Sequence, residues 1–239
     1  MPGTPDDPAE FDAYARQYAE LIRDPIREKF ATESRFFAER KLQVIDAFFR
    51  RRGVDTHRLH WLDVGCGLGD LLKLGRPRFA SVSGCDPSRE MLQACSDLKP
   101  RHQTTIDQLP FDSAAFDFVT AVCVYHHVAE DQRLSLTREI FRVLKPGGVA
   151  AIIEHNPWNP ATRLIVSRTP VDANAKLLTA PEVRRLARGA NARIAATRYF
   201  LYLPEQIYKR LGFIENGLSG LPFGGQYVVF AEKGTGQKL

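Results

Sequence analysis

The sequence predicts an α/β protein built on a doubly wound, mostly parallel sheet. Two observations lead to this fold class. From about residue 59 onward, short apolar runs alternate with helical stretches, as in successive βαβ units. A glycine-rich turn, 65–69, follows the first apolar run, at the position where such folds bind a ligand.

The expected elements follow from apolar periodicity and from turn residues. Two amphipathic helices, 11–30 and 34–52, precede the sheet. Strands are expected at 60–64, 81–85, 103–106, 116–124 and 149–154, and near 193–201 and 227–231. The helices between them are expected at 70–74, 89–98, 130–144 and 180–188. Lys145-Pro146-Gly147-Gly148 ends the third of these, because proline and glycine stop a helix and start a turn.

Size and charge indicate one ordinary globular domain. The 239 residues fall short of the roughly 250 at which domains usually split. Lysine and arginine number 33 against 28 acids, a net charge of +5, which raises the question of a nucleic-acid partner. The basic clusters 50–52 and 184–193 lie on expected helix faces, and acids interleave elsewhere, so we interpret them as solvated surface and expect no nucleic acid.

The four cysteines form neither a CxxC pair nor another zinc-type spacing, so no thiol metal site is expected. Most lie in apolar runs, as reduced cysteines do, which favours a cytoplasmic protein. No stretch is apolar enough for a membrane span or a cleavable signal. Residues 1–9, with three prolines, are expected to be disordered, and the sequence leaves monomer and homodimer equally open.

The glycine-rich turn predicts a cofactor loop. Gly65, Gly67 and Gly69 stand where backbone must approach a ligand and adopt dihedral angles that a Cβ disfavours. Asp63 and the nearby carbonyls suit a cationic amino group, and helix amides beyond the turn suit a carboxylate. The dinucleotide pattern GxGxxG would need glycine or alanine at Asp70, whose charge would repel pyrophosphate.

Two later segments supply further candidate ligands of a nucleoside. Asp86, at the end of the second expected strand, suits a carboxylate that accepts both ribose hydroxyls. The alternative is that Asp86 or Ser88 caps the following helix, and both roles are compatible. After the third strand, Asp107 and Gln108 offer an acceptor and an amide to an adenine edge.

The ordered set of motifs resembles the class I S-adenosylmethionine-dependent methyltransferases. It comprises DxGxGxG at 63–69, the acid Asp86, Asp-x-x-x-Phe at 107–111, FDxV at 116–119 and LKPGG at 144–148. The resemblance covers residues 59–154 and implies a seven-stranded sheet whose last strand is antiparallel. It also implies that S-adenosylmethionine is the cofactor. The residues expected to bind it are Asp63, Gly65, Cys66, Gly67, Gly69, Asp86, Pro87, Met91, Asp107, Gln108 and Cys123.

Three histidines are candidate bases for methyl transfer, because an acceptor hydroxyl, phenol or protonated amine must lose a proton. His126 and His127 follow the fourth strand, and His155 follows the fifth, all at the edge where α/β sheets bind ligands. The alternatives are helix capping for the pair and an Asn-Pro turn at His155. A metal site drawn from Glu154, His155 and either neighbour lacks ligand spacing, so none is expected.

The N-terminal helices, 10–57, are expected to form a lid over a methyltransferase domain at 58–239. Insertions near 156–178 and 203–223 would select the substrate. The side chains expected to face the cofactor and substrate are Tyr14, Tyr18, Lys41, Asn156 and Trp158. A lid of aromatic and cationic groups would exclude water from the reaction.

The function expected from these features is methylation of oxygen or nitrogen on a small, aromatic or biosynthetic metabolite. The net positive charge keeps a second alternative open, an RNA or protein methyltransferase. The third alternative is a cofactor-binding protein that transfers no methyl group, because function resides in the site and not in the fold.

Overall fold

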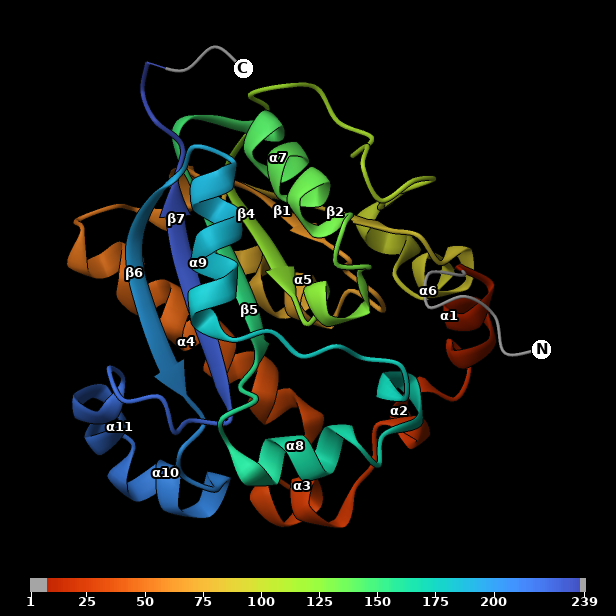
Figure 1. Ribbon diagram of the computed structural model, residues 1–239. Helices are drawn as coiled ribbons and strands as arrows, with labels where there is room; N and C mark the ends of the chain where they lie inside the picture. Colours follow the sequence, from red (N-terminus) through yellow and green to blue (C-terminus); the bar gives the residue numbers. More distant parts are fainter. Residues whose placement is uncertain (1–7, 237–239) are drawn as a thin grey trace.

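The computed structural model describes residues 8–236 and contains one seven-stranded sheet in that part of the chain. The strands are β1 (His60–Val64), β2 (Ser81–Asp86), β3 (Arg101–His102), β4 (Phe116–Val122), β5 (Leu144–His155), β6 (Arg193–Phe200) and β7 (Gln226–Glu232). Their order is β3-β2-β1-β4-β5-β7-β6. All neighbours are parallel except β7, which runs antiparallel to β5 and β6 (Figure 1). The predicted fold, including its reversed last strand, is confirmed.

Helices cover both faces of the sheet, as a doubly wound fold requires (Figure 1). The helices of the core are α4 (Ser34–Arg51), α5 (Asp70–Gly75), α6 (Arg89–Gln93), α7 (Arg133–Val143) and α9 (Ala180–Gly189). One core cluster contains residues of α7 and α9, and the other contains residues of α4, α5 and α6. Successive strand residues alternate between the two clusters, because side chains of a strand point to opposite faces. Leu62 therefore packs under α7 and its neighbour Trp61 packs under α4, and both are fully buried.

The N-terminal segment is divided into three short helices and not the single helix expected over 11–30. These are α1 (Pro8–Tyr14), α2 (Tyr18–Leu21) and α3 (Pro25–Phe30). The break has a local cause: the Asp24 side chain accepts hydrogen bonds from two amides of α3, and Pro25 occupies the first helical position. Of residues 1–9, expected to be disordered, 1–7 lie outside the described residues, and Pro8 and Ala9 belong to α1.

The third strand is shorter and earlier than predicted. It spans only Arg101 and His102, which pair with Cys85 and Asp86 of β2. The prediction of 103–106 was wrong because the chain turns after Gln103. The Gln103 side-chain amide donates to the carbonyls of Thr105 and Ile106, at 3.0 and 3.4 Å. A turn stabilised in this way cannot continue the ladder.

Two strand boundaries also differ from expectation. β4 ends at Val122, before Cys123, whose φ of 56° turns the chain into a 3-10 turn at Tyr125–His127. The segment 145–148 begins the long strand β5 instead of forming a separate turn. Gly147, with φ of 77°, and a register shift between Phe116 and Phe118 accommodate it.

The carboxyl edge of the parallel strands is covered by elements from distant parts of the chain (Figure 1). They are α1, which packs on α6, α2, which packs on the 3-10 turn Pro170–Asp172, and α3, which packs on α8 (Pro160–Val166). The segment 203–223 forms α10 (Glu205–Leu211) and α11 (Phe213–Leu218).

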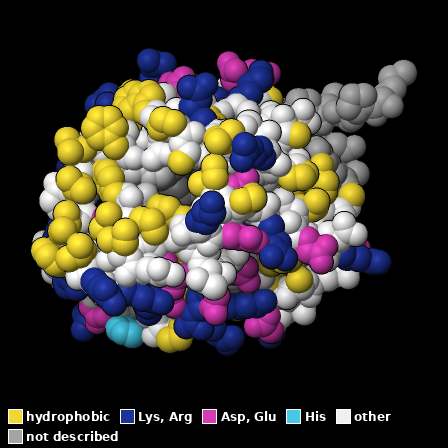
Figure 2. All heavy atoms as spheres, turned by 90° about the horizontal axis from the view of Figure 1, so that it is seen from below, with side chains coloured by type: hydrophobic (Ala, Val, Ile, Leu, Met, Phe, Trp, Pro, Cys, Tyr) yellow, Lys and Arg dark blue, Asp and Glu magenta, His cyan; other side chains and the backbone are white. Residues whose placement is uncertain are grey.

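Figure 2 views the molecule from the side of these covering helices and shows apolar side chains gathered toward one end. Among the large hydrophobic side chains of the described residues, Phe213 and Phe223 are the most exposed, at 70% and 63%. Elsewhere on this face basic and acidic side chains are interspersed. Among the described helices, none is long and apolar enough to cross a membrane.

Candidate functional site

The glycine loop between β1 and α5 is shaped to hold a ligand against backbone. Gly65, Gly67 and Gly69 have φ of 69°, 51° and 73°, in the left-handed region. The amides of Gly65 and Cys66 both donate to the Cys85 carbonyl of β2, which anchors the start of the loop. A Cβ at Gly67 would meet nothing within 4 Å, so open space lies beside this backbone. The loop therefore fits a cofactor that backbone approaches closely.

Asp63, at the end of β1, is a buried carboxylate beside that loop. It is 3% exposed, and its Oδ1 accepts a 2.5 Å hydrogen bond from the Thr120 hydroxyl of β4. Burial raises the pKa of Asp63 to about 7. A buried carboxylate that cannot easily keep its charge alone gains from a cation, which is the partner that an ammonium group supplies.

Asp86, at the end of β2, links the loop to α6. Its Oδ2 accepts from the Gly67 amide at 2.8 Å and its Oδ1 accepts from the Ser88 amide at 2.9 Å. Burial raises the pKa of Asp86. The cap of α6 is Ser88, whose hydroxyl accepts from the Met91 amide and donates to Asp12 of α1. Ser88 is therefore the residue that caps α6, whereas Asp86 contacts the glycine loop.

The remaining residues predicted to bind the cofactor differ in their burial. Met91 is buried on α6, and Cys66 is buried beside the Gly84 backbone. The Pro87 carbonyl contacts the His102 ring at 3.0 Å. Asp107 and Gln108 are exposed and line a surface hollow of about 600 Å³ with Glu139 and Arg142.

Beyond β4, the backbone turn that carries His126 is held by one buried carboxylate. Glu154, at the end of β5, accepts from the amides of Val124 and Tyr125 through Oε1, at 2.9 and 2.8 Å. Its Oε2 contacts the His126 Nδ1 at 2.5 Å. Both side chains are at most 1% exposed. Glu154 thus determines where the His126 ring lies.

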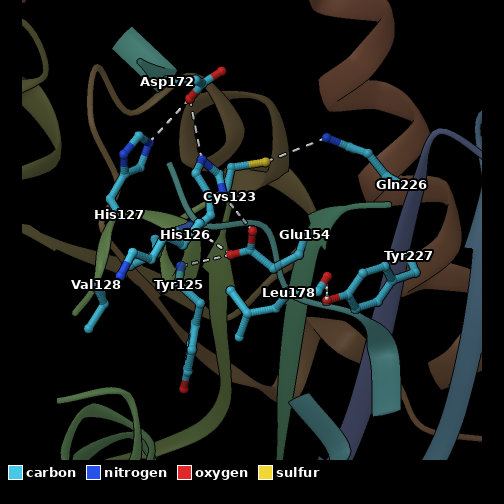
Figure 3. A network of polar contacts seen from close by, with 12 residues as sticks. Cys123, Tyr125, His126, His127, Val128, Glu154, Asp172, Leu178, Gln226 and Tyr227 are labelled. Carbon is cyan, nitrogen blue, oxygen red and sulfur yellow. Dashed lines mark hydrogen bonds and ion pairs between the residues drawn. The ribbon is translucent and has the colours of Figure 1, made fainter. Parts of the chain in front are cut away.

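Asp172 brings the two neighbouring histidines together from the other side. It ends the 3-10 turn Pro170–Asp172, and its Oδ1 lies 3.4 Å from the Nε2 of His126 and 3.4 Å from the Nε2 of His127. Figure 3 shows both rings directed at this carboxylate, with Glu154 on the opposite side of His126. The His155 ring is 5.3 Å from the His126 ring, centroid to centroid. The three predicted histidines therefore form one cluster.

Their surroundings give the three imidazoles different charges. Burial opposes a charge on His126, but the carboxylates of Glu154 and Asp172 outweigh it and raise its pKa to about 9. Burial lowers the pKa of His127, despite its contact with Asp172. Burial and the neighbouring His126 lower the pKa of His155 to about 4. At neutral pH, His127 and His155 are neutral, whereas both ring nitrogens of His126 face carboxylates.

Two of the expected lid residues lie close to this cluster. Tyr18 and Lys41 lie deep within the protein, as does Cys123, yet each keeps some accessible surface. Burial lowers the pKa of Lys41, and the Arg27 guanidinium lowers it further, whereas the Asp63 carboxylate opposes this shift. Lys41 is therefore within electrostatic range of the Asp63 carboxylate beside the glycine loop.

The other lid assignments have different surroundings. Tyr14 contacts Phe11 edge to face, and Phe11 contacts the His127 ring in the same manner with the ring centroids 5.1 Å apart, so α1 covers the histidines. Asn156 is 1% exposed, and its amide donates to the carbonyls of Pro222 and Gly224, while its oxygen accepts from the Trp158 amide. These hydrogen bonds hold the Asn156 side chain within the turn after β5, as expected if this segment is an Asn-Pro turn with a structural role. Trp158 is 48% exposed.

Sequence reasoning missed Asp172 and the role of Glu154. Glu154 carries a detectable signal, because a carboxylate that ends a fully buried strand at the ligand edge needs a partner. Asp172 carries none, because it lies in a polar segment without a motif, 46 positions after His126, and only the tertiary fold brings it there. Thr120, the partner of Asp63, was also missed, since it lies within an apolar strand.

Comparison with known families and proteins places these features among methyltransferases. Residues 62–152 match the family described as methyltransferase domain. A tRNA (carboxymethyluridine(34)-5-O)-methyltransferase of Arabidopsis thaliana is 34% identical over 115 residues, which are 47% of this chain and 28% of the relative. A malonyl-[acyl-carrier protein] O-methyltransferase of Salmonella typhimurium is 34% identical over 93 residues, 38% of this chain and 36% of the relative.

Similarity to solved structures extends over nearly the whole chain. An S-adenosylmethionine-dependent methyltransferase of Thermotoga maritima has a TM-score of 0.67 at 18% identity and covers 93% of this chain and 98% of its own. At that identity the likeness shows the fold. The curated relatives above, in contrast, are matched over only 28% and 36% of their length.

Proposed function

We propose that this chain, which belongs to the class I S-adenosylmethionine-dependent methyltransferases, transfers a methyl group to an oxygen or nitrogen atom of a small molecule. One observation supports a small molecule as the substrate. The polar cluster at the ends of β4 and β5 lies beneath α1, α2 and α3, so that an acceptor would have to be enclosed to reach it. Enclosure suits a small metabolite, and it excludes water from the reaction.

The residues around the glycine loop fit the cofactor by their chemistry. S-adenosylmethionine, when bound, supplies a methyl group activated by an adjacent sulfonium charge. Asp63 would hold its amino group, Asp86 its ribose hydroxyls, and the backbone at Gly67 would lie against it. These contacts orient the reactants, and orientation is the main requirement of an in-line displacement.

The acceptor side of the site contains a neutral imidazole that can take a proton. His155 is the last residue of β5, and its side chain makes no hydrogen bond to another described residue that would occupy it. His126 is less suited, because carboxylates face both of its nitrogens. We assign the role of base to His155, with Lys41 as the group that attracts an anionic acceptor.

An RNA substrate is the second candidate, since one relative is named a tRNA methyltransferase. The position of the basic residues speaks against it. Arg52 and Arg193 both pair with Glu232, which lies opposite Val149 at the edge where the parallel strands begin. His155 pairs with Gln226 at the other edge. Arg52 and Arg193 thus lie at the edge of the sheet opposite the one that an RNA would have to reach.

Calorimetric titration with S-adenosylhomocysteine, the expected product, tests the cofactor site. We expect micromolar binding by the native chain and at least tenfold weaker binding by Asp86→Ala, equivalent to about 1.4 kcal/mol. The variant loses the ribose acceptor and the bond that holds the Gly67 amide. Asp97→Ala, on the exposed turn after α6, is the control and should bind normally. Absence of binding by folded native protein would refute the proposed function.

Cofactor affinity should also depend on pH through Asp63. A carboxyl with a pKa near 7 is mostly protonated at pH 6 and mostly ionised at pH 8, and only the ionised form pairs with an ammonium group. Affinity for S-adenosylhomocysteine should therefore rise about tenfold between these pH values, in proportion to the ionised fraction. Asp63→Asn should bind weakly at both. An equal slope in that variant would assign the dependence to another group.

The contribution of Asp63 to the free energy of unfolding should change with pH in the direction opposite to the cofactor affinity. Because the folded-state pKa is raised from 3.8 to about 7, the folded chain holds this proton where the unfolded chain has lost it. The contribution of Asp63 to stability is therefore greatest at low pH and declines as the pH rises through 7.

The substrate class is tested by measuring the release of S-adenosylhomocysteine in the presence of candidate acceptors. Hydroxylated and amino metabolites should support turnover that His155→Gln reduces, while total tRNA should not. Turnover with tRNA alone would overturn the small-molecule proposal and leave the cofactor assignment intact.

A further inference from the structure

The cluster around Asp172 has a feature that methyl transfer does not require. The Nε2 atoms of His126 and His127 and a carboxylate oxygen of Asp172 all lie within 4.8 Å of one another. The three side chains come from two separate segments, the 3-10 turn after β4 and the insertion after α8. Two imidazoles and one carboxylate that converge on one point are a common ligand set for divalent transition metals.

Two of the three distances between the ligand atoms agree with a shared ion. Zinc binds nitrogen and oxygen ligands at about 2.0–2.2 Å, and two ligands of a tetrahedral ion at that distance lie about 3.4 Å apart. The Asp172 Oδ1 is 3.4 Å from each Nε2. For a direct hydrogen bond, 3.4 Å is long, since N–H donors usually lie about 2.9 Å from an oxygen.

The orientation of His126 points in the same direction. Its Nδ1 lies 2.5 Å from Glu154, so the Nδ1 proton belongs to that contact and the Nε2 faces Asp172. Histidines that bind metals typically donate their other ring nitrogen to a carboxylate in this manner. Glu154 is itself held by two backbone amides, so the His126 ring is preorganised.

We propose that His126, His127 and Asp172 bind a divalent transition-metal ion at the acceptor side of the site. Three protein ligands leave at least one coordination position open, as in catalytic metal sites.

This inference rests on the proposed function and narrows it. An ion in this position would bind an acceptor oxygen and lower its pKa, so that the hydroxyl loses its proton more readily to a neutral imidazole such as His155. The oxygen would then form its bond to the methyl carbon as the bond between carbon and sulfur breaks. Oxygen is accordingly favoured over nitrogen as the acceptor atom.

Cobalt(II) provides a test that does not depend on activity, because its visible absorption reports the ligands around it. Untagged full-length protein, dialysed against EDTA and then against buffer, is titrated with Co²⁺. We expect one ion per chain, bound with micromolar affinity and displaced by Zn²⁺. His127→Gln and Asp172→Asn should each weaken binding at least tenfold. His57→Gln, an exposed histidine on the turn before β1, is the matched control and should bind like the native chain.

S-adenosylhomocysteine titration of the same samples separates the two proposals. Variants that bind this ligand normally are folded, so loss of Co²⁺ binding in them supports the metal site. Failure of the native chain to bind Co²⁺ or Zn²⁺, or unchanged Co²⁺ binding in both variants, would overturn it. Normal Co²⁺ binding without S-adenosylhomocysteine binding would refute the proposed function alone.

Discussion

Replacing Glu154 with alanine is expected to reduce the free energy of unfolding by about 3–5 kcal/mol, the usual cost of removing one partner of a buried ion pair. The carboxylate is fully buried and serves three donors, the amides of Val124 and Tyr125 and the His126 ring. Its removal leaves all three without this acceptor, in a place from which water is largely excluded. Each unpaired group then costs its own desolvation energy.

Urea denaturation measures this loss, and two further variants define its origin. Glu130→Ala removes an exposed ion pair with Lys176, both side chains being 68% exposed, and should change stability by less than about 0.5 kcal/mol. Glu154→Gln keeps an oxygen for the two amides but loses the charge opposite His126, so an intermediate loss is expected. If Glu154→Ala is as stable as Glu130→Ala, the backbone turn does not depend on this carboxylate.

The sheet and the cofactor loop could be predicted because their signals are local. The turn from β1 through Gly65 to Gly69 is encoded within seven residues, and positive φ at each glycine confirms the predicted backbone conformation. The apolar runs of β4 and β5 likewise correspond to strands that are buried on both faces. In these segments residue type, dihedral angle and burial all agree, so one stretch of sequence suffices.

The acceptor side could be predicted only in part, since its partners are distant in sequence. His126 and His127 lie in the 3-10 turn that follows β4, close to the predicted strand end, but what surrounds them comes from β5 and from the turn before Ala173. The same limit applies to α1, whose contact with His127 through Phe11 joins residues 116 positions apart. No periodicity within one segment encodes such contacts.

At the cofactor loop, alanine at Gly67 is expected to weaken S-adenosylhomocysteine binding at least tenfold while the chain remains folded. The φ of 51° costs an alanine roughly 1–2 kcal/mol, and no described atom lies within 4 Å of the added Cβ. That open space is where the proposed cofactor lies against backbone. A methyl group there would compete with the ligand and not with the protein.

Two other glycines separate ligand exclusion from backbone strain. Gly53→Ala imposes a similar φ of 68°, also with nothing within 4 Å, in the exposed turn after α4, so it should lose similar stability and bind normally. Gly65→Ala places its Cβ 2.5 Å from the Val124 Cγ2, on a stiff branched side chain. This variant should lose much more stability than Gly53→Ala or Gly67→Ala. Thermal unfolding and calorimetry on the three variants therefore give three different patterns. Equal loss of binding in Gly53→Ala and Gly67→Ala would mean that strain alone is responsible, and that the space beside Gly67 is not the cofactor site.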